Sequence, residues 1–179
     1  MRSQLLIVSF AALLLGCGTG GAPEAQTPQA NEAPPEPAVS TEWHEFDAET
    51  FRFRIPAGVE SIPIQGTDSQ VGLLEGAGFR IRFDFGWYSD DSFEGQGNSP
   101  GFSREDVVLG GVAAQLATYT LDNPSFHHVV AVYAPNVFNT AEDTPGKTSL
   151  FFVVEFENAA ESAIAGEIAR SITGWKKRN

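Results

Sequence analysis

Residues 79–87 carry the clearest strand pattern in this chain of 179 residues. Apolar and polar side chains alternate there, with Phe79, Ile81, Phe83, Phe85 and Trp87 in one set and Arg80, Arg82 and Asp84 in the other. Successive side chains of a β-strand point to opposite faces, so this segment predicts a strand with one aromatic, buried face. Similar short segments recur from Thr41 onward between Gly, Pro, Asn and Asp residues. They predict strands joined by turns.

Several of these segments form predicted hairpins. The pairs are 43–46 with 51–55, 71–75 with 79–87 across Gly76-Ala77-Gly78, and 106–109 with 112–121 across Gly110-Gly111. Residues 61–65 and 126–134 add two further predicted strands. Residues 150–156 are apolar at odd and even positions alike, which predicts a central strand covered on both faces.

The last predicted element changes period. Ile164, Ile168 and Ile172 recur at every fourth position, which predicts a helix with one buried stripe. Asn158 and Glu161 have the spacing of a capping box, and Gly174 is placed for a C-terminal cap. The predicted fold class is α+β: an antiparallel sheet closed on one face by a C-terminal helix, in a single globular domain at residues 41–179.

Three segments of this domain resemble a known superfamily. They are Phe-Arg-Phe-Arg-Ile-Pro-Ala-Gly at 51–58, Val-Leu-Gly-Gly-Val-Ala-Ala at 107–113 and Glu-Ile-Ala-Arg-Ser-Ile at 167–172. In this order they look like PsbP-like and DcrB-like domains. The resemblance implies an α/β/α or α+β sandwich in an envelope accessory protein, and it carries over no catalytic residue. The chain departs from that pattern in having no clear helix early in the domain.

The N-terminus has the organisation of a signal peptide. Arg2 precedes an apolar run at residues 5–15, which is too short to cross a bilayer because a spanning helix needs about 20 residues. The run ends in Leu14-Leu15-Gly16-Cys17, which resembles the lipobox of bacterial lipoproteins. The resemblance implies removal of residues 1–16 and attachment of lipid to Cys17. The alternative is a buried N-terminal helix with an incidental cysteine.

Residues 17–40 are predicted to be a tether between the lipid and the domain. They are rich in Pro, Ala and Glu and show no apolar periodicity, so they cannot bury enough surface to fold. A proline-directed recognition segment is the alternative. Gly18 rather than Asp follows Cys17, which in the lipoprotein family favours the outer membrane of an organism with two membranes. The expected location is therefore the cell envelope, facing the periplasm or the cell surface.

Charge and cysteine usage exclude several functions. The formal net charge of −12 argues against nucleic acid as a partner and against broad contact with anionic lipid. The membrane is then contacted through the lipid on Cys17. Because Cys17 is the only cysteine, its acylation leaves no thiol for a disulfide, a metal ligand or a nucleophile.

No catalytic residue, cofactor or metal site is predicted. The sequence has no nucleophile elbow, zinc-protease motif or phosphate-binding loop. The loop Asp90–Asn98 has the spacing of a calcium-binding loop, with Asp90, Ser92, Glu94, Gly95 and Asn98 at positions 1, 3, 5, 6 and 9. Gly101 stands at position 12, where a bidentate carboxylate is required, so a solvated acidic loop is favoured. His127 and His128 are adjacent on a predicted strand and point to opposite faces.

One group of charged residues indicates a possible binding surface. Arg52, Arg54, Arg80 and Arg82 lie opposite the aromatic faces of two predicted strands. If these strands are neighbours, the four arginines form a basic patch that suits an anionic partner. The alternative is a solvated face whose arginines are neutralised by the chain's own carboxylates.

These features favour a lipid-anchored, non-enzymatic binding or accessory module of the envelope, with a possible protein partner. The alternative is a lipoprotein that carries an apolar ligand, or acts as a chaperone, through a pocket between sheet and helix. A cavity among Phe53, Phe83, Phe85 and Trp87 favours the carrier, whereas a dense core there favours an interaction surface.

Overall fold

The computed structural model of the chain describes residues 42–87, 89, 93, 95–138 and 148–176. All of them belong to the second of the two units into which the chain divides, Pro37–Asn179. The predicted signal peptide, Cys17 and the tether lie outside the described residues, as do Asp90, Asp91, Ser92 and Glu94 of the candidate calcium loop.

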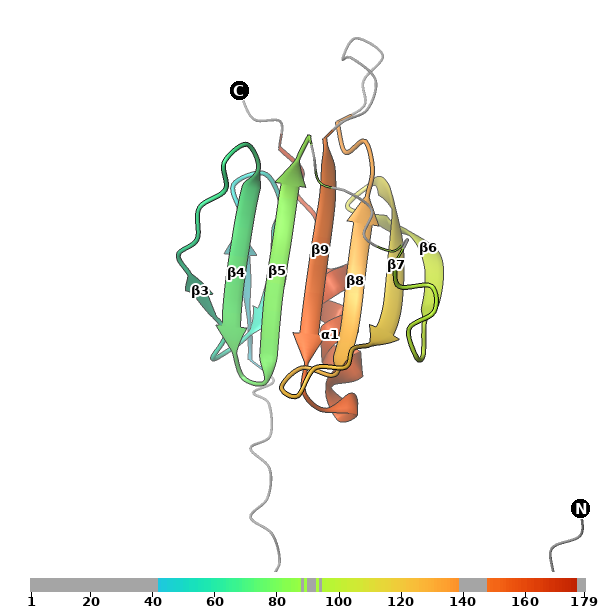
Figure 1. The fold of residues 1–179 in the computed structure, drawn as a ribbon. Helices are drawn as coiled ribbons and strands as arrows, with labels where there is room; N and C mark the ends of the chain where they lie inside the picture. Colours follow the sequence, from blue (N-terminus) through green and yellow to red (C-terminus); the bar gives the residue numbers. More distant parts are fainter. Residues whose placement is uncertain (1–41, 88, 90–92, 94, 139–147, 177–179) are drawn as a thin grey trace, which may run out of the picture. The chain divides into compact units, whose positions relative to one another are not determined.

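Seven strands of the described residues form one antiparallel sheet (Figure 1). In spatial order they are β3 (Glu60–Ile62), β4 (Gln70–Gly76), β5 (Phe79–Gly86), β9 (Ser149–Phe156), β8 (His128–Ala134), β7 (Val112–Thr120) and β6 (Ser103–Leu109). Strand β9 comes last in the sequence but lies in the middle, between β5 and β8. Residues 150–156 are therefore a central strand, as predicted.

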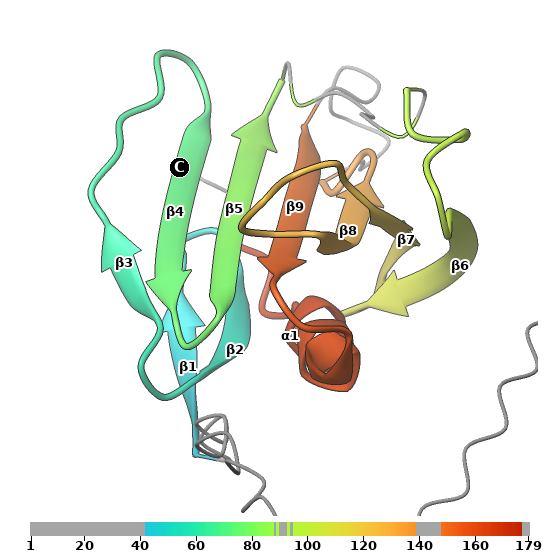
Figure 2. The same ribbon diagram turned by 60° about the horizontal axis from the view of Figure 1, so that its bottom comes forward.

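A hairpin and a helix cover one face of this sheet. The hairpin consists of β1 (Trp43–Asp47) and β2 (Arg52–Pro56), which pair with each other apart from the main sheet. The helix α1 (Ser162–Arg170) follows a short 3-10 helix, η1 (Ala159–Glu161). Figure 2 shows the hairpin and α1 on the same side of the sheet. The predicted α+β class is confirmed at this level, and we call the covered side the inner face and the opposite side the outer face.

Aromatic rings fill the space between the hairpin and the inner face. Phe53 of β2 is 1% exposed, and its ring centroid lies 4.9 Å from that of Phe152 and 6.2 Å from that of Phe83. Phe51, just before β2, meets Phe83 edge-on at 5.1 Å. Edge-on contacts suit the charge distribution of aromatic rings, in addition to the area that they bury. This ring cluster holds the hairpin on the sheet.

Strand β5 shows the predicted alternation up to Gly86 and not beyond it. Phe79, Ile81, Phe83 and Phe85 are buried on the inner face, but Trp87 is 61% exposed. The pairing of β5 with β9 stops at Gly86, so the pleat of the sheet no longer determines the direction of the next side chain. The prediction that Trp87 belongs to the buried set is therefore wrong.

The predicted helix is present, with its N-terminal cap. The carboxylate of Glu161 accepts a hydrogen bond from the Asn158 N–H at 3.2 Å, and the Asn158 side chain accepts one from the Ala160 N–H at 3.0 Å. This capping box closes η1, which leads directly into α1. Residues Ala165, Ile168 and Ala169 form the buried stripe of α1.

The C-terminal end of the helix differs from the prediction. The cap of α1 is Ser171, so Gly174 is not the helix cap and Ile172 is buried just beyond the helix. Gly174 instead has a φ of +67° and lies against the Arg52 side chain, where a Cβ would come within 2.6 Å of Nε. The following Trp175 packs against the core, and its Nε1 donates a hydrogen bond to the carbonyl of Leu109 at 2.9 Å.

Candidate functional site

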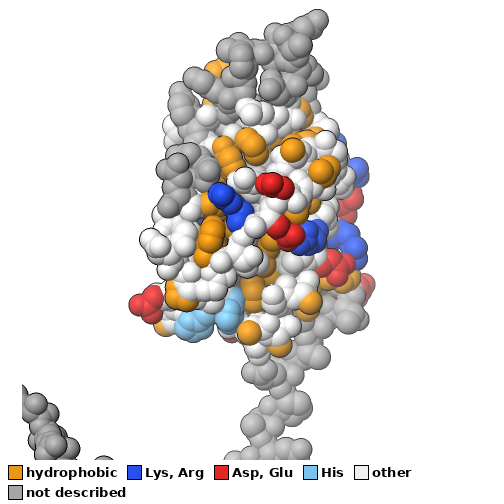
Figure 3. All heavy atoms as spheres, turned by 90° about the vertical axis from the view of Figure 1, so that its right-hand side faces the viewer, with side chains coloured by type: hydrophobic (Ala, Val, Ile, Leu, Met, Phe, Trp, Pro, Cys, Tyr) orange, Lys and Arg blue, Asp and Glu red, His pale blue; other side chains and the backbone are white. Residues whose placement is uncertain are grey.

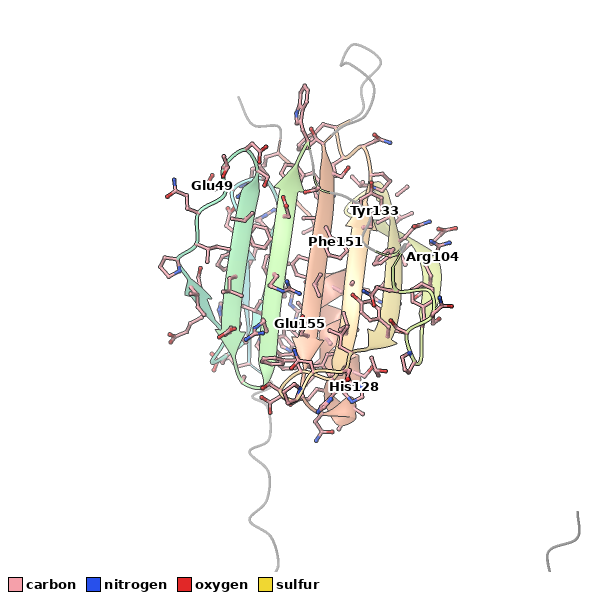
Figure 4. All side chains as sticks on the ribbon, in the orientation of Figure 1. Glu49, Arg104, His128, Tyr133, Phe151 and Glu155 are labelled. Carbon is pink, nitrogen blue, oxygen red and sulfur yellow. The ribbon has the colours of Figure 1, made fainter. Side chains whose placement is uncertain are left out.

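In the part of the chain that the structure describes, the outer face of the sheet is covered over one half and open over the other. Phe93 packs against Tyr133 and Phe151 at centroid distances of 6.5 and 5.9 Å, and Phe102 lies 6.5 Å from Tyr119. Figure 4 shows Tyr133 and Phe151 side by side on β8 and β9, where they pair in register. We call the part over β7 to β9 the covered half, and the part over β4 and β5 the open half.

A hollow of about 340 Å³ lies in the open half, at its border with β9. It is lined by Ile64, Val71, Gly72, Leu73, Arg82, Phe83, Asp84, Phe151 and Val153. Mostly apolar walls with a few polar groups, and a volume of roughly 300 Å³ or more, are typical of ligand sites. The hollow is the candidate functional site.

The register of the strands explains this lining. Val71, Asp84 and Phe151 form one row across β4, β5 and β9, and Leu73, Arg82 and Val153 form the next. Residues two apart on a strand share a face, so both rows project from the outer face. The rows are about 7 Å apart, because each residue advances a strand by about 3.4 Å.

Gly72 supports the hollow from beneath. A Cβ at this position would lie 2.1 Å from Cε1 of Phe83, which belongs to the core on the inner face. The ring of Phe83 therefore packs directly against the backbone of β4. A larger residue at 72 would displace that ring.

Four charged side chains form a network beside the hollow. Glu155 has a side chain that is only 5% exposed, and it accepts a hydrogen bond from Arg82 Nη2 at 2.8 Å. Arg80 Nη1 lies 3.9 Å from Glu155 Oε2, and its Nε donates to Glu75 at 2.5 Å. The ring of Phe126, on the loop that reaches across β9 toward β5 (Figure 2), lies 4.6 Å from the Arg80 guanidinium. Two carboxylates and two guanidiniums balance, so the network is neutral.

Asp84 is a carboxylate that this network leaves out. Its Oδ1 and its carbonyl oxygen both accept from the Ser89 hydroxyl, at 2.8 Å each. No Lys or Arg among the described residues forms an ion pair with it. The hollow thus presents one carboxylate whose charge is not balanced by a described cation, between the apolar side chains of Val71 and Phe151.

Tyr119, in the covered half, titrates under the influence of the same network. Burial raises the pKa of the Tyr119 phenol above its ordinary value of 10.0, and the negative charge of Glu155 raises this pKa further. Arg82 opposes both effects. Because the folded state then retains a proton that the unfolded state loses, this residue makes folding less favourable as the pH rises above about 10.

The structure does not bring together Arg52, Arg54, Arg80 and Arg82, which the sequence analysis places in one possible basic patch. The first two lie on β2 in the hairpin and the last two on β5 in the main sheet. Phe53 and Phe83 fill the core between these strands, so the two arginine pairs point away from each other. The hairpin arginines pair with this chain's own carboxylates, Arg52 with Glu45 and Arg54 with Glu167. On the side that carries β6, acidic and basic side chains are also intermixed (Figure 3).

Among the described residues, the aromatic residues considered for a sheet–helix pocket do not share a hollow, since only Phe83 of the four lines the one described above. Phe53, Phe83 and Phe85 are at most 6% exposed and belong to one core cluster, whereas Trp87 is at the surface. The hollow described above lies on the opposite, outer face. In the part of the chain that the structure describes, no group of three or more His, Cys, Asp or Glu residues is placed to hold a metal ion.

The hollow was not predicted from the sequence. Asp84 was assigned to the polar face of its strand, and Phe151 only to a strand covered on both sides. One feature of the predicted hairpin could have indicated it: apolar Val71 and Leu73 lie on one strand, and the strand that pairs with it has a polar face that contains Asp84. An apolar strand beside a charged one on the same face indicates a surface that is neither core nor fully solvated.

No protein-family model matches the chain, and no curated protein matches it. None of the described helices is long and apolar enough to cross a membrane.

Proposed function

We propose that this chain is a bacterial envelope lipoprotein, anchored by lipid on Cys17, whose domain is a non-enzymatic module that binds a partner in the envelope. The observation that carries the proposal is the hollow in the open half of the outer face. The aromatic residues between the sheet and its inner layer form a dense core, which favours an interaction surface over carriage of an apolar ligand in a sheet–helix pocket.

The N-terminal sequence supports the anchor. Leu14–Cys17 has the lipobox pattern, and acyl chains contribute about 0.8 kcal/mol per buried methylene, so two or more chains hold a protein stably at a membrane. An extended tether of about 23 residues reaches roughly 70 Å. With Gly18 after Cys17, the outer membrane is the proposed destination, and the α+β layering of the domain is compatible with a PsbP-like accessory protein.

Replacing Cys17 with alanine is expected to abolish the anchor. The variant cannot accept diacylglycerol, so it is expected to keep its signal peptide and to lose the acyl mass found on the native protein. Mass spectrometry of the N-terminal peptide and metabolic labelling with a palmitate analogue measure both effects. Gly18→Asp is the control, because it is expected to retain the lipid and, in an organism with two membranes, to change the membrane. An unlabelled native protein would contradict the anchor.

The binding part of the proposal concerns Leu73, which lines the hollow. A partner that occupies the open half is expected to shield this position in the anchored protein and to leave Val108, on the opposite edge strand, accessible. Labelling of single cysteines at these two positions measures the difference.

A further inference from the structure

We propose, as a refinement that rests on the function above, that the hollow binds an extended basic segment of a partner protein. In this segment an apolar side chain enters the hollow, and a Lys or Arg two positions away pairs with Asp84. The charge of the hollow, the spacing of its two rows and the surface beside it support this segment as the occupant.

The charge of the hollow favours a cation over an anion. Arg82 is already engaged by the buried Glu155 carboxylate at 2.8 Å, inside a neutral network. Among the described residues, Asp84 accepts a side-chain hydrogen bond only from the neutral hydroxyl of Ser89. A basic side chain can therefore form an ion pair with Asp84 without displacing an existing one. The net charge of −12 adds to this preference, because it attracts cationic partners and repels anionic ones during association.

The spacing of the rows favours an extended peptide. Leu73 and Val153 lie in one row, and Asp84 lies in the neighbouring row about 7 Å along the strands. In an extended peptide, side chains at positions i and i+2 point the same way and are also about 7 Å apart. An apolar residue in the first row thus places the residue two positions away over Asp84.

The surface next to the hollow has room for such a segment. Strand β3 lies at the edge of the sheet, and its three residues are exposed. Ile62 and Ile64 are 36% and 47% exposed, so apolar surface continues from the hollow past this edge. A short peptide can extend across this surface, whereas a small amine would leave it uncovered.

The test uses the full-length lipoprotein in neutral detergent and three fluorescent probe peptides. The first contains Lys-Ser-Leu within an Ala/Ser sequence, the second contains Glu-Ser-Leu, and the third separates Lys and Leu by two serines. Fluorescence anisotropy measures the affinity of each. We expect the first peptide to bind about tenfold more tightly than the second, since an exposed ion pair changes affinity by up to about fivefold and the second peptide adds repulsion. The third is expected to bind more weakly than the first.

Two variants test whether the preference for the Lys-Ser-Leu peptide over the Glu-Ser-Leu peptide arises at the hollow. Asp84→Asn retains an oxygen that accepts from Ser89, and it is expected to lower affinity for the Lys-Ser-Leu peptide about fivefold. Asp106→Asn makes the same charge change on the far edge strand β6 and is expected to have little effect. Added salt screens exposed charges, so it is expected to reduce the difference between the affinities of the native protein for the Lys-Ser-Leu and Glu-Ser-Leu peptides.

Three results would overturn the inference: equal affinity for the Lys and Glu peptides, preference for the Glu peptide, or an equal effect of the two variants. If cysteine protection at Leu73 nevertheless occurs in the anchored protein, the proposed function stands and the hollow takes a partner of different chemistry. If that protection is absent as well, the proposed function fails too.

Discussion

Phe53→Ala is expected to lower the free energy of unfolding by about 3–5 kcal/mol, the usual cost of truncating a buried phenylalanine. Phe53 is 1% exposed and meets Phe152 and Phe83 of the main sheet edge-on, so its removal leaves a cavity between the hairpin and the sheet. Urea unfolding followed by far-ultraviolet circular dichroism measures this loss. The slope of the transition is expected to stay the same, because the domain still unfolds as one unit.

Trp87→Ala is the matched aromatic control. The Trp87 side chain is 61% exposed and belongs neither to the core under the hairpin nor to the packed residues of the covered half. The free energy of unfolding is therefore expected to change by no more than about 0.5 kcal/mol. Similar losses for the two variants would contradict the layered core, since they would place Trp87 in the packed interior.

The double variant Arg80→Met/Arg82→Met is expected to lower the free energy of unfolding by about 3 kcal/mol or more. It removes the two cationic partners that Glu155 has among the described residues. The Glu155 side chain is 5% exposed, and an unpaired buried charge is far more costly than the loss of a surface ion pair. Adding Glu155→Leu is expected to recover most of the loss, because no buried charge then remains. Urea unfolding of the native protein and the two variants measures the loss and the recovery.

Arg54→Met/Arg170→Met is the control for this experiment. It also removes two arginines, but their partners Glu167 and Glu105 have side chains that are 47% and 55% exposed and regain water. This control is expected to lower the free energy of unfolding by about 1 kcal/mol. An equal loss of unfolding free energy in the two double variants would mean that Glu155 is hydrated in the folded protein.

Local pattern was sufficient to predict most elements of this fold. Alternation in residues 79–87 predicted β5, which ends at Gly86. The glycine pair at 110–111 predicted the turn between β6 and β7, and isoleucine spacing predicted α1. These features are set by side chains close together in sequence. Trp87 was misassigned because the strand pairing that controls alternation ends one residue earlier.

The arrangement of the strands was not predictable in the same way. The order of the main sheet places β9 between β5 and β8, and β2 lies in a separate layer. The grouping of the arginines depended on whether β2 and β5 are neighbours, and sequence pattern alone does not specify pairing between distant strands. The result is two separate arginine pairs in place of one patch.

The hollow depends on contacts that are even harder to predict from the sequence. It exists because, among the described residues, Phe93 and Phe102 cover one half of the outer face and leave the other half open. It also needs Gly72, where the absence of a Cβ lets the ring of Phe83 pack beneath β4. Neither the reach of a covering loop nor a contact between facing residues follows from alternation.

Labelling of single cysteines in the membrane-anchored protein tests most directly whether the open half binds a partner. Cys17 is the only cysteine of the chain and is expected to be acylated, so Leu73→Cys and Val108→Cys each introduce one free thiol. A membrane-impermeant maleimide is applied to isolated envelopes, opened to admit it, and to the purified lipoprotein. We expect labelling of Leu73→Cys to be several-fold slower in envelopes than in the purified protein, and labelling of Val108→Cys to be similar in both. Equal labelling of Leu73→Cys in envelopes and in the purified protein would contradict a bound partner on the open half.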